Sequence, residues 1–117
     1  MKYMLLIYLE ENAISESERT ACYEKSIALT QELASRGQFI SANPLQPVST
    51  ATSLRVREGR RMITDGPFTE TREHLGGYFL VDARDLNEAI DIASRIPGAK
   101  FGTVEIRPIV ELSGMPA

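Results

Sequence analysis

The sequence predicts an α+β domain of the ferredoxin-like sandwich type. Two segments carry helix signals, other segments alternate like strands, and the order is strand, long helix, strands with a hairpin, strand, helix, strand. Two helices and a mostly antiparallel sheet in this order form a sandwich in which the helices cover one face of the sheet. A length of 117 residues suits one domain, so residues 1–117 are taken as a single unit.

The first strand, residues 3–9, is apolar on both faces. One face carries Tyr3, Leu5, Ile7 and Leu9, and the other carries Met4, Leu6 and Tyr8. Two helices cover only one face of a sheet, so the second apolar face would meet water in a single chain. We therefore expect a homodimer in which the two sheets pack face to face.

The first helix is predicted to begin at Ser15 and to end at Gly37. Ser15 and Glu18 have the spacing of a capping box, and glycine is a common helix stop. Ser26 and Thr30 lie within the apolar face, where their hydroxyls either bond back to helix carbonyls or look into a pocket. The apolar residues of that face are Cys22, Tyr23, Ile27, Leu29, Leu33 and Ala34.

The rest of the chain alternates between strand and helix signals. A turn at Glu58 and Gly59 joins the strands of a hairpin, and Asp85 with Glu88 marks the start of the second helix. Pro108 indicates a bulge or an edge position in the last strand. The predicted segments are a strand at 38–41, a loop at 42–50, the hairpin at 53–64, a strand at 77–83, the second helix at 85–98 and a strand at 103–112.

Composition excludes several classes of function. The chain is 43% hydrophobic and 25% charged, as in ordinary globular proteins, and its net charge of −3 argues against non-specific nucleic-acid binding. Its single cysteine, Cys22, has no partner for an internal disulfide, which fits a reducing, cytoplasmic setting. One histidine and one cysteine offer no ligand cluster for zinc or iron. We expect no cofactor, and no segment is long and apolar enough to span a membrane.

Residues 64–81 concentrate charge around the only histidine of the chain. Glu70 and His74 are four residues apart, so one helical turn would place them side by side. Imidazole and carboxylate groups are the usual carriers of protons in catalysis. The candidate catalytic residues are Asp65 and His74, and the candidate binding residues are Ser26, Glu70, Glu73 and Arg107, the last for an anionic group.

The same segment also has an architectural interpretation, which we prefer. Asp65 can cap a turn by accepting a hydrogen bond from an amide near Phe68, because Pro67 has no amide hydrogen to offer. The Phe68 ring would then be buried and would pin the loop to the body of the domain. Gly66 would take a conformation that other residues avoid.

The run "DGPFTETREHLGGYFLVDARDLNEAIDIASRIPG" resembles the DGPF family of YCII-related proteins. The similarity extends to "YMLLIY" at the start, "LASRGQFISANPLQP" in the middle and "VEIRPI" near the end. The motif residues are Asp65, Gly66, Pro67 and Phe68, followed by Thr69, Glu70, Glu73, His74, Leu75, Gly76 and Gly77. The resemblance implies a dimeric ferredoxin-like α/β barrel.

The resemblance implies less about activity. The family is largely uncharacterised, some members carry a label that links them to phosphonate metabolism, and its genes often neighbour extracytoplasmic-function sigma factors. Some YCII-related proteins have a candidate His–Asp pair on the first helix. This chain has Ser26 and Ser35 at those positions, so the pair is not carried over.

Two classes of function therefore stay open. The first is a small dimer that binds a small polar metabolite in a pocket near residues 65–74, with acid–base catalysis there. The second is a non-catalytic ligand-binding or regulatory module, linked through the family to a sigma-factor stress response. The sequence alone does not separate an enzyme from a binding module.

Overall fold

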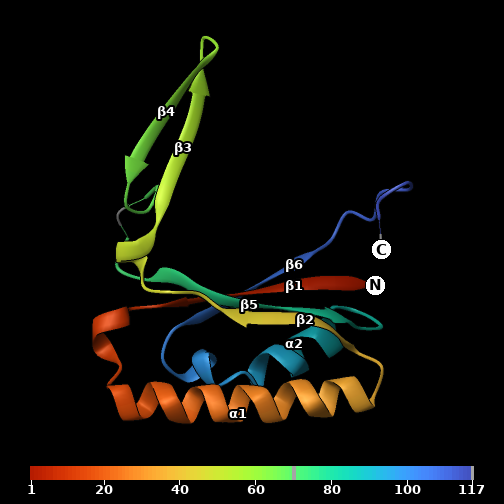
Figure 1. Cartoon of the computed structure of the whole chain (residues 1–117). Coiled ribbons are helices and arrows are strands. Elements are labelled where there is room, and N and C mark those ends of the chain that lie inside the picture. Colours follow the sequence, from red (N-terminus) through yellow and green to blue (C-terminus); the bar gives the residue numbers. More distant parts are fainter. Residues whose placement is uncertain (70, 117) are drawn as a thin grey trace.

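A computed structural model describes residues 1–69 and 71–116. A four-stranded antiparallel sheet has the order β2-β5-β1-β6, and both α-helices lie on one of its faces (Figure 1). The elements are β1 (Lys2–Leu9), α1 (Glu16–Ser35), β2 (Phe39–Pro44), β3 (Thr52–Arg57), β4 (Arg60–Asp65), β5 (His74–Asp82), α2 (Leu86–Ser94) and β6 (Thr103–Pro108), with short 3-10 turns at Glu11–Ala13, Val48–Thr50 and Pro97–Lys100. This confirms the ferredoxin-like α+β class, with the β3–β4 hairpin as an addition.

The predicted helix starts and the predicted end of α1 are confirmed, whereas α2 ends at Ser94, before the predicted stop at Pro97 and Gly98. The Ser15 hydroxyl accepts from the Glu18 amide at 3.2 Å, and the Glu18 carboxylate accepts from the Ser15 amide at 3.0 Å. The Asp85 carboxylate accepts from the Glu88 amide at 2.9 Å at the start of α2. Gly37, just past the end of α1, has a φ of 72°, which glycine adopts without strain.

Replacing Ser15 by alanine is expected to lower the free energy of unfolding by about 0.5–2 kcal/mol, because the Glu18 amide loses its acceptor. Urea denaturation measures the change. Ser17→Ala is the matched control, since Ser17 lies within the first turn and bonds no backbone amide in the described part of the chain. Equal losses in both variants would mean that the capping box contributes nothing specific.

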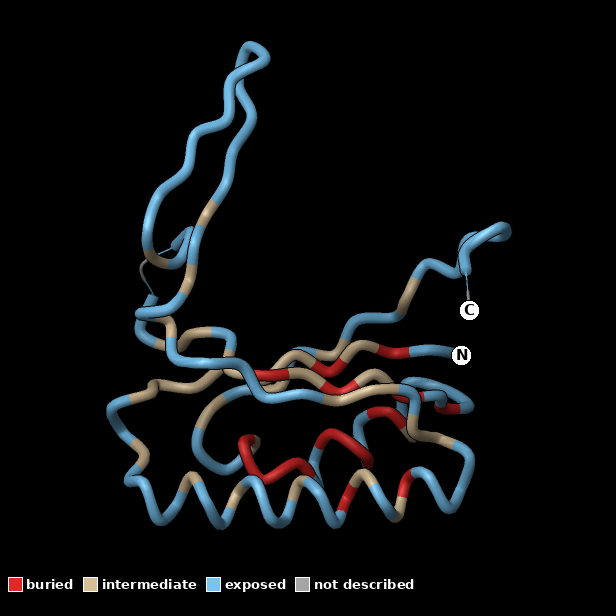
Figure 2. Tube along the Cα trace, viewed as in Figure 1, coloured by how far each residue is buried: buried red, intermediate tan, exposed pale blue. Residues whose placement is uncertain are grey.

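The core lies between the helices and the covered face of the sheet. Figure 2 shows buried segments in the middle of the sheet, around α2 and in the second half of α1. The buried apolar residues are Tyr3, Leu5, Leu29, Leu33, Phe79, Val81, Ala83, Ala89, Ile92, Ala93 and Ile96. As predicted for a strand covered on one face only, β1 buries Tyr3 and Leu5 and leaves Met4 half-buried on the other face.

The predicted apolar face of α1 is wrong in its first half. Leu29 and Leu33 are buried, but Tyr23 is exposed and Ile27 is 58% exposed. In the second half of the helix, Ala34 is exposed as well. Helical periodicity identifies the residues that share a stripe, but only the neighbouring elements decide how much of the stripe is covered.

Three strand boundaries differ from the predictions by three or four residues, and others differ by one. β2 continues to Pro44, and β5 begins at His74 rather than at Gly77. β6 ends at Pro108, four residues before the predicted end at Leu112, because proline has no amide hydrogen to continue the ladder. The next residue makes a single further bond, from the Ile109 amide to the Lys2 carbonyl at 2.9 Å, and the chain then leaves the sheet.

The predicted hairpin is confirmed, and it stands away from the sheet. Glu58 and Gly59 form its turn with φ angles of 52° and 74°. The hairpin rises on the side of the sheet that the helices do not cover, and the C-terminal residues rise on that same side (Figure 1). Neither helix within the described ranges is long and apolar enough to cross a membrane.

Candidate functional site

A cavity of about 1100 Å³ lies between the first half of α1 and the sheet. Small-molecule sites in proteins typically measure about 300–1,000 Å³, so this space is large enough for a ligand. Residues of β1, α1, β2, β5 and the loop that follows β2 line the cavity. The exposed first half of α1 therefore forms one wall of a cavity.

The cavity exists because small residues face each other across it. Along β5, Val81 and Phe79 fill the space beneath the helices, but the next position on that face is Gly77, paired with Ile7. On α1, the large side chain of Leu29 gives way to Ser26 one turn earlier. Because neither the sheet nor α1 has a large side chain at these positions, the space between them stays open.

Gly77 also permits the close approach of β2 to β5. A β-carbon at this position would lie 3.0 Å from the Asn43 carbonyl oxygen and 3.2 Å from the Pro44 α-carbon. Both contacts are with backbone, which cannot rotate away as a side chain can. Glycine at position 77 therefore allows β2 to pair closely with β5, and it also leaves space for the cavity.

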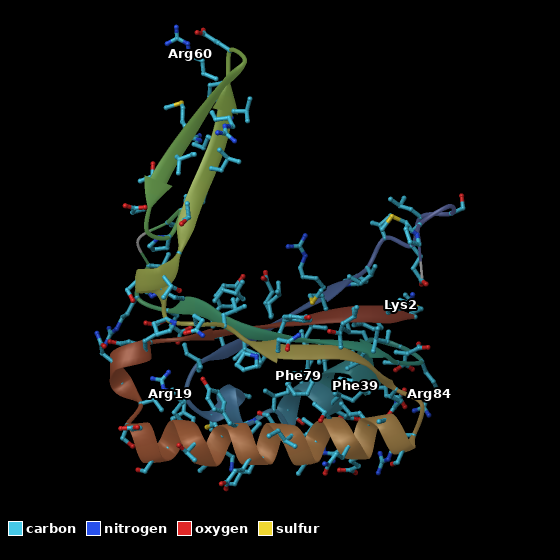
Figure 3. The ribbon with its side chains drawn as sticks, viewed as in Figure 1. Lys2, Arg19, Phe39, Arg60, Phe79 and Arg84 are labelled. Atoms are coloured by element: carbon cyan, nitrogen blue, oxygen red, sulfur yellow. The ribbon has the colours of Figure 1, made fainter. Side chains whose placement is uncertain are left out.

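The cavity wall is mainly apolar, and Arg19 and Glu11 bring two groups of opposite charge to it. Figure 3 shows Phe39 and Phe79 between the sheet and the helices, and Arg19 nearer the start of α1. The Arg19 guanidinium donates to the Glu11 carbonyl at 3.1 Å, and the Glu11 carboxylate accepts from the Val48 amide at 2.8 Å. These bonds leave Arg19 with further donors, because a guanidinium has five.

Both hydroxyls of the α1 face line the cavity. Thr30 also bonds back to its own helix, donating to the Ile27 carbonyl at 2.6 Å, so both interpretations of this residue hold. The Ser26 hydroxyl is half-buried and has no hydrogen bond within the described residues. It is therefore the better placed of the two to bind a ligand.

The sequence interpretation missed Arg19, Glu11 and Cys22 as cavity residues. Cys22 also borders a second, smaller cavity of about 540 Å³, on the side of α1 near residues 94–97. Space on both sides of Cys22 explains why the first half of α1 is exposed. Small side chains at positions 22 and 26 of an otherwise apolar stripe were the signal in the sequence.

The expectation of a buried Phe68 is wrong, since the Phe68 side chain is 78% exposed. The Asp65 carboxylate accepts no hydrogen bond from any described residue. The turn is held instead by the Gly66 amide, which donates to the Ala51 carbonyl at 2.8 Å, and by the Ser53 hydroxyl, which donates to the Gly66 carbonyl at 2.8 Å. One backbone bond and one bond from the Ser53 hydroxyl therefore replace the predicted cap.

The loop residues predicted to act in acid–base chemistry lie outside the cavity lining. Asp65 ends β4, and His74 begins β5 opposite Leu9. Glu73 accepts a hydrogen bond from the Thr103 hydroxyl at 2.9 Å. Glu70, the predicted partner of His74, lies outside the described residues.

Arg107 lies on the uncovered face of the sheet. It is directly opposite Met4, whose neighbour Leu5 points into the core. On the same face, the Tyr8 hydroxyl donates to the Glu105 carboxylate at 3.3 Å. Burial first and the negative charge of Glu105 second raise the pKa of Tyr8. Arg107 is thus separated from the cavity by the sheet.

A family model of the YCII-related domain matches residues 1–113. The chain belongs to the YCII-related family. An uncharacterised protein of Rhizobium meliloti (strain 1021) is 32% identical to it over 114 residues, covering 93% of this chain and 92% of the relative. The resemblance inferred from the motif is confirmed, and neither match brings an activity or a ligand with it.

The family resemblance also relates one cavity residue to a candidate functional position of other family members. Ser26, which the resemblance aligns with the candidate histidine of some YCII-related proteins, lines the cavity. Ser35, at the position of their aspartate, is exposed and donates to the Glu32 carbonyl at 2.6 Å. The hydroxyl of Ser35 is thus bonded within α1.

Proposed function

We propose that this YCII-related protein binds a small molecule in the cavity between α1 and the sheet. The observation that carries the proposal is a large cavity whose apolar wall includes Arg19 toward one end. The neighbouring Glu11 carboxylate accepts from the Val48 amide, and the Arg19 guanidinium has further donors for a ligand. Ligand sites commonly combine an apolar lining with a few placed polar groups. The ligand is a compound with an apolar body and one anionic or polar end. This composition favours a larger apolar part than the small polar metabolite expected from the sequence.

Binding without catalysis is the better supported class. The acid–base alternative requires Asp65 and His74 to reach one ligand, and neither lines the cavity. A binding module also suits the regulatory setting that the family resemblance implies. If a bound compound is turned over, and Asp65→Asn or His74→Gln stops turnover without weakening binding, the enzymatic alternative replaces this proposal.

The proposal also includes a homodimer formed through the uncovered face of the sheet. The centre of this face is apolar, and polar groups surround it, which is the usual anatomy of a protein interface. Its apolar and aromatic members are Met4, Leu6, Tyr8, Tyr78 and Leu80, and its polar members include Ser41, Asn43, Glu105 and Arg107. A second copy would remove the apolar members from water. We place the dimer in the cytoplasm, because a lone Cys22 suits a reducing compartment.

Octanoate and octanamide are suitable probes of the cavity, since they share an apolar chain and differ in charge. A probe present at a hundred times its dissociation constant would stabilise the fold by about 2.7 kcal/mol. A rise in the melting temperature measures this stabilisation. Ser26→Leu fills the cavity and is expected to abolish the shift, whereas Ala28→Leu, on the exposed side of α1, is expected to keep it. Arg19→Gln is expected to remove the preference for octanoate over octanamide.

Two results would contradict the cavity proposal. One is the absence of a shift with either probe and with other amphipathic carboxylates. The other is a shift that Ser26→Leu leaves unchanged, because the compound would then bind elsewhere. Circular dichroism of each variant establishes that α1 is intact, since leucine favours helix at least as well as serine does.

A further inference from the structure

The hairpin of β3 and β4, residues 52–65, is an arm with one apolar face. Cross-strand pairing places Leu54 opposite Ile63 and Val56 opposite Arg61, so Leu54, Val56 and Ile63 share a face. Each of the three is more than half exposed. An isolated two-stranded hairpin is marginally stable in water, and three exposed apolar side chains on one face indicate that something covers it.

The arm and the rest of the chain carry opposite charge. The arm has four arginines, at positions 55, 57, 60 and 61, against Glu58 and Asp65, which gives it a charge of +2. Since the whole chain carries −3, the remaining residues carry −5. The arm points away from its own body (Figure 1), so the acidic surface available to it is that of a second copy.

The arm is long enough to reach past a second sheet. A strand of six residues, such as β3, spans about 20 Å, whereas two sheets that pack face to face are about 10 Å apart. An arm that rises from the uncovered face of one sheet therefore passes the edge of the other. Whatever covers this sheet must lie beside the arm.

The C-terminal segment, residues 109–116, offers a complementary surface. It rises from the other end of the same sheet face (Figures 1 and 2). Val110 is 79% exposed and Leu112 is 62% exposed, and Glu111 between them is acidic. A two-fold axis that exchanges the two ends of the sheet brings each arm beside the C-terminal segment of the other chain.

We propose that the arm clasps a second copy of this chain by packing against its C-terminal segment. Leu54, Val56 and Ile63 contact the partner's Val110 and the partner's Leu112, and the arm arginines face the acidic body of the partner. The contact occurs twice in the dimer. The inference rests on the proposed homodimer and adds a second contact to the packing of the sheets.

Sedimentation equilibrium of arm variants tests the clasp. Ile63→Glu is expected to raise the dimer dissociation constant about tenfold or more, because a charge replaces an apolar contact. Thr64→Glu is the matched control on the opposite face of the same strand and is expected to change the constant by less than about threefold. Both positions are exposed in the single chain, so neither change disturbs the core.

A pair of substitutions identifies what the arm touches. Leu112→Glu is expected to weaken the dimer much as Ile63→Glu does. The single variant Ile63→Lys is expected to weaken the dimer as well. The double variant with Ile63→Lys and Leu112→Glu is expected to associate more tightly than the product of the effects of Ile63→Lys and Leu112→Glu predicts, because the new charges attract each other between subunits.

Each contrary result has a distinct meaning. A dimer that Ile63→Glu leaves unchanged overturns the clasp and keeps the sheet interface. Single effects that multiply exactly as independent changes do would show that the arm contacts another part of the partner. A wild-type chain that stays monomeric overturns the homodimer and the clasp together, and leaves ligand binding in the cavity as a separate question.

Discussion

Replacing Leu33 by alanine is expected to lower the free energy of unfolding by about 2–5 kcal/mol, the usual loss for a large-to-small change in a core. Leu33 is 0% exposed and packs with Leu29 in the only part of α1 that reaches the core within the described residues. The rigid sheet above it cannot collapse to fill the space that a smaller side chain leaves. Urea denaturation measures the loss.

Ile27→Ala is the matched control, because the predicted apolar stripe of α1 includes both residues. Ile27 is 58% exposed, so the expected loss is below about 1 kcal/mol. A loss for Ile27→Ala that equals the loss for Leu33→Ala would show that the first half of α1 packs on the sheet. The cavity would then be closed in solution, and the ligand proposal would fail with it.

Replacing Leu6 by lysine is expected to weaken the proposed homodimer about a hundredfold, since a central apolar contact is lost and a charged group would have to leave water in the interface. Leu6 lies in β1 on the uncovered face, directly opposite Tyr78 and Glu105. A lysine there can pair with Glu105 within its own chain, so the fold is expected to survive the change. Sedimentation equilibrium measures the association.

Ile90→Lys provides the comparison for this prediction. Ile90 is an exposed apolar residue of α2, on the helix layer, and its replacement is expected to leave the dimer intact. Dissociation of Ile90→Lys with retention of the Leu6→Lys dimer would move the interface from the sheet to the helices. The arm could not then reach its partner, because it rises on the sheet side.

The features that the sequence alone could predict depend on residues close together in the chain. Ser15 with Glu18 and Asp85 with Glu88 mark helix starts through bonds that span three residues. Glu58 with Gly59 specifies the hairpin because few residues other than glycine adopt a positive φ. The family assignment likewise rests on a continuous motif.

The errors concern contacts between distant parts of the chain. The sequence suggests that Phe68 is buried, but it lies just after an arm that has no core of its own, so its ring stays exposed. The Arg55 guanidinium lies over this ring, 5.8 Å from its centre, in a cation–π contact. No local pattern shows whether a hairpin folds back onto the sheet or projects from it.

In the candidate site, too, local features could be predicted from the sequence and contacts between distant residues could not. The sequence by itself determined that Ser26 and Thr30 interrupt an apolar stripe, and it left open whether they meet a pocket. Only the tertiary structure decided this, because Ser26 on α1 and Gly77 on β5, which are far apart in the sequence, line the same cavity. Arg107 was assigned to a site by its charge, and the pairing of β6 with β1 places it on the opposite face of the sheet. Periodicity determines which side chains share a face, but the side of the sheet on which that face lies, and what covers it, depend on contacts between elements that the chain brings together only on folding.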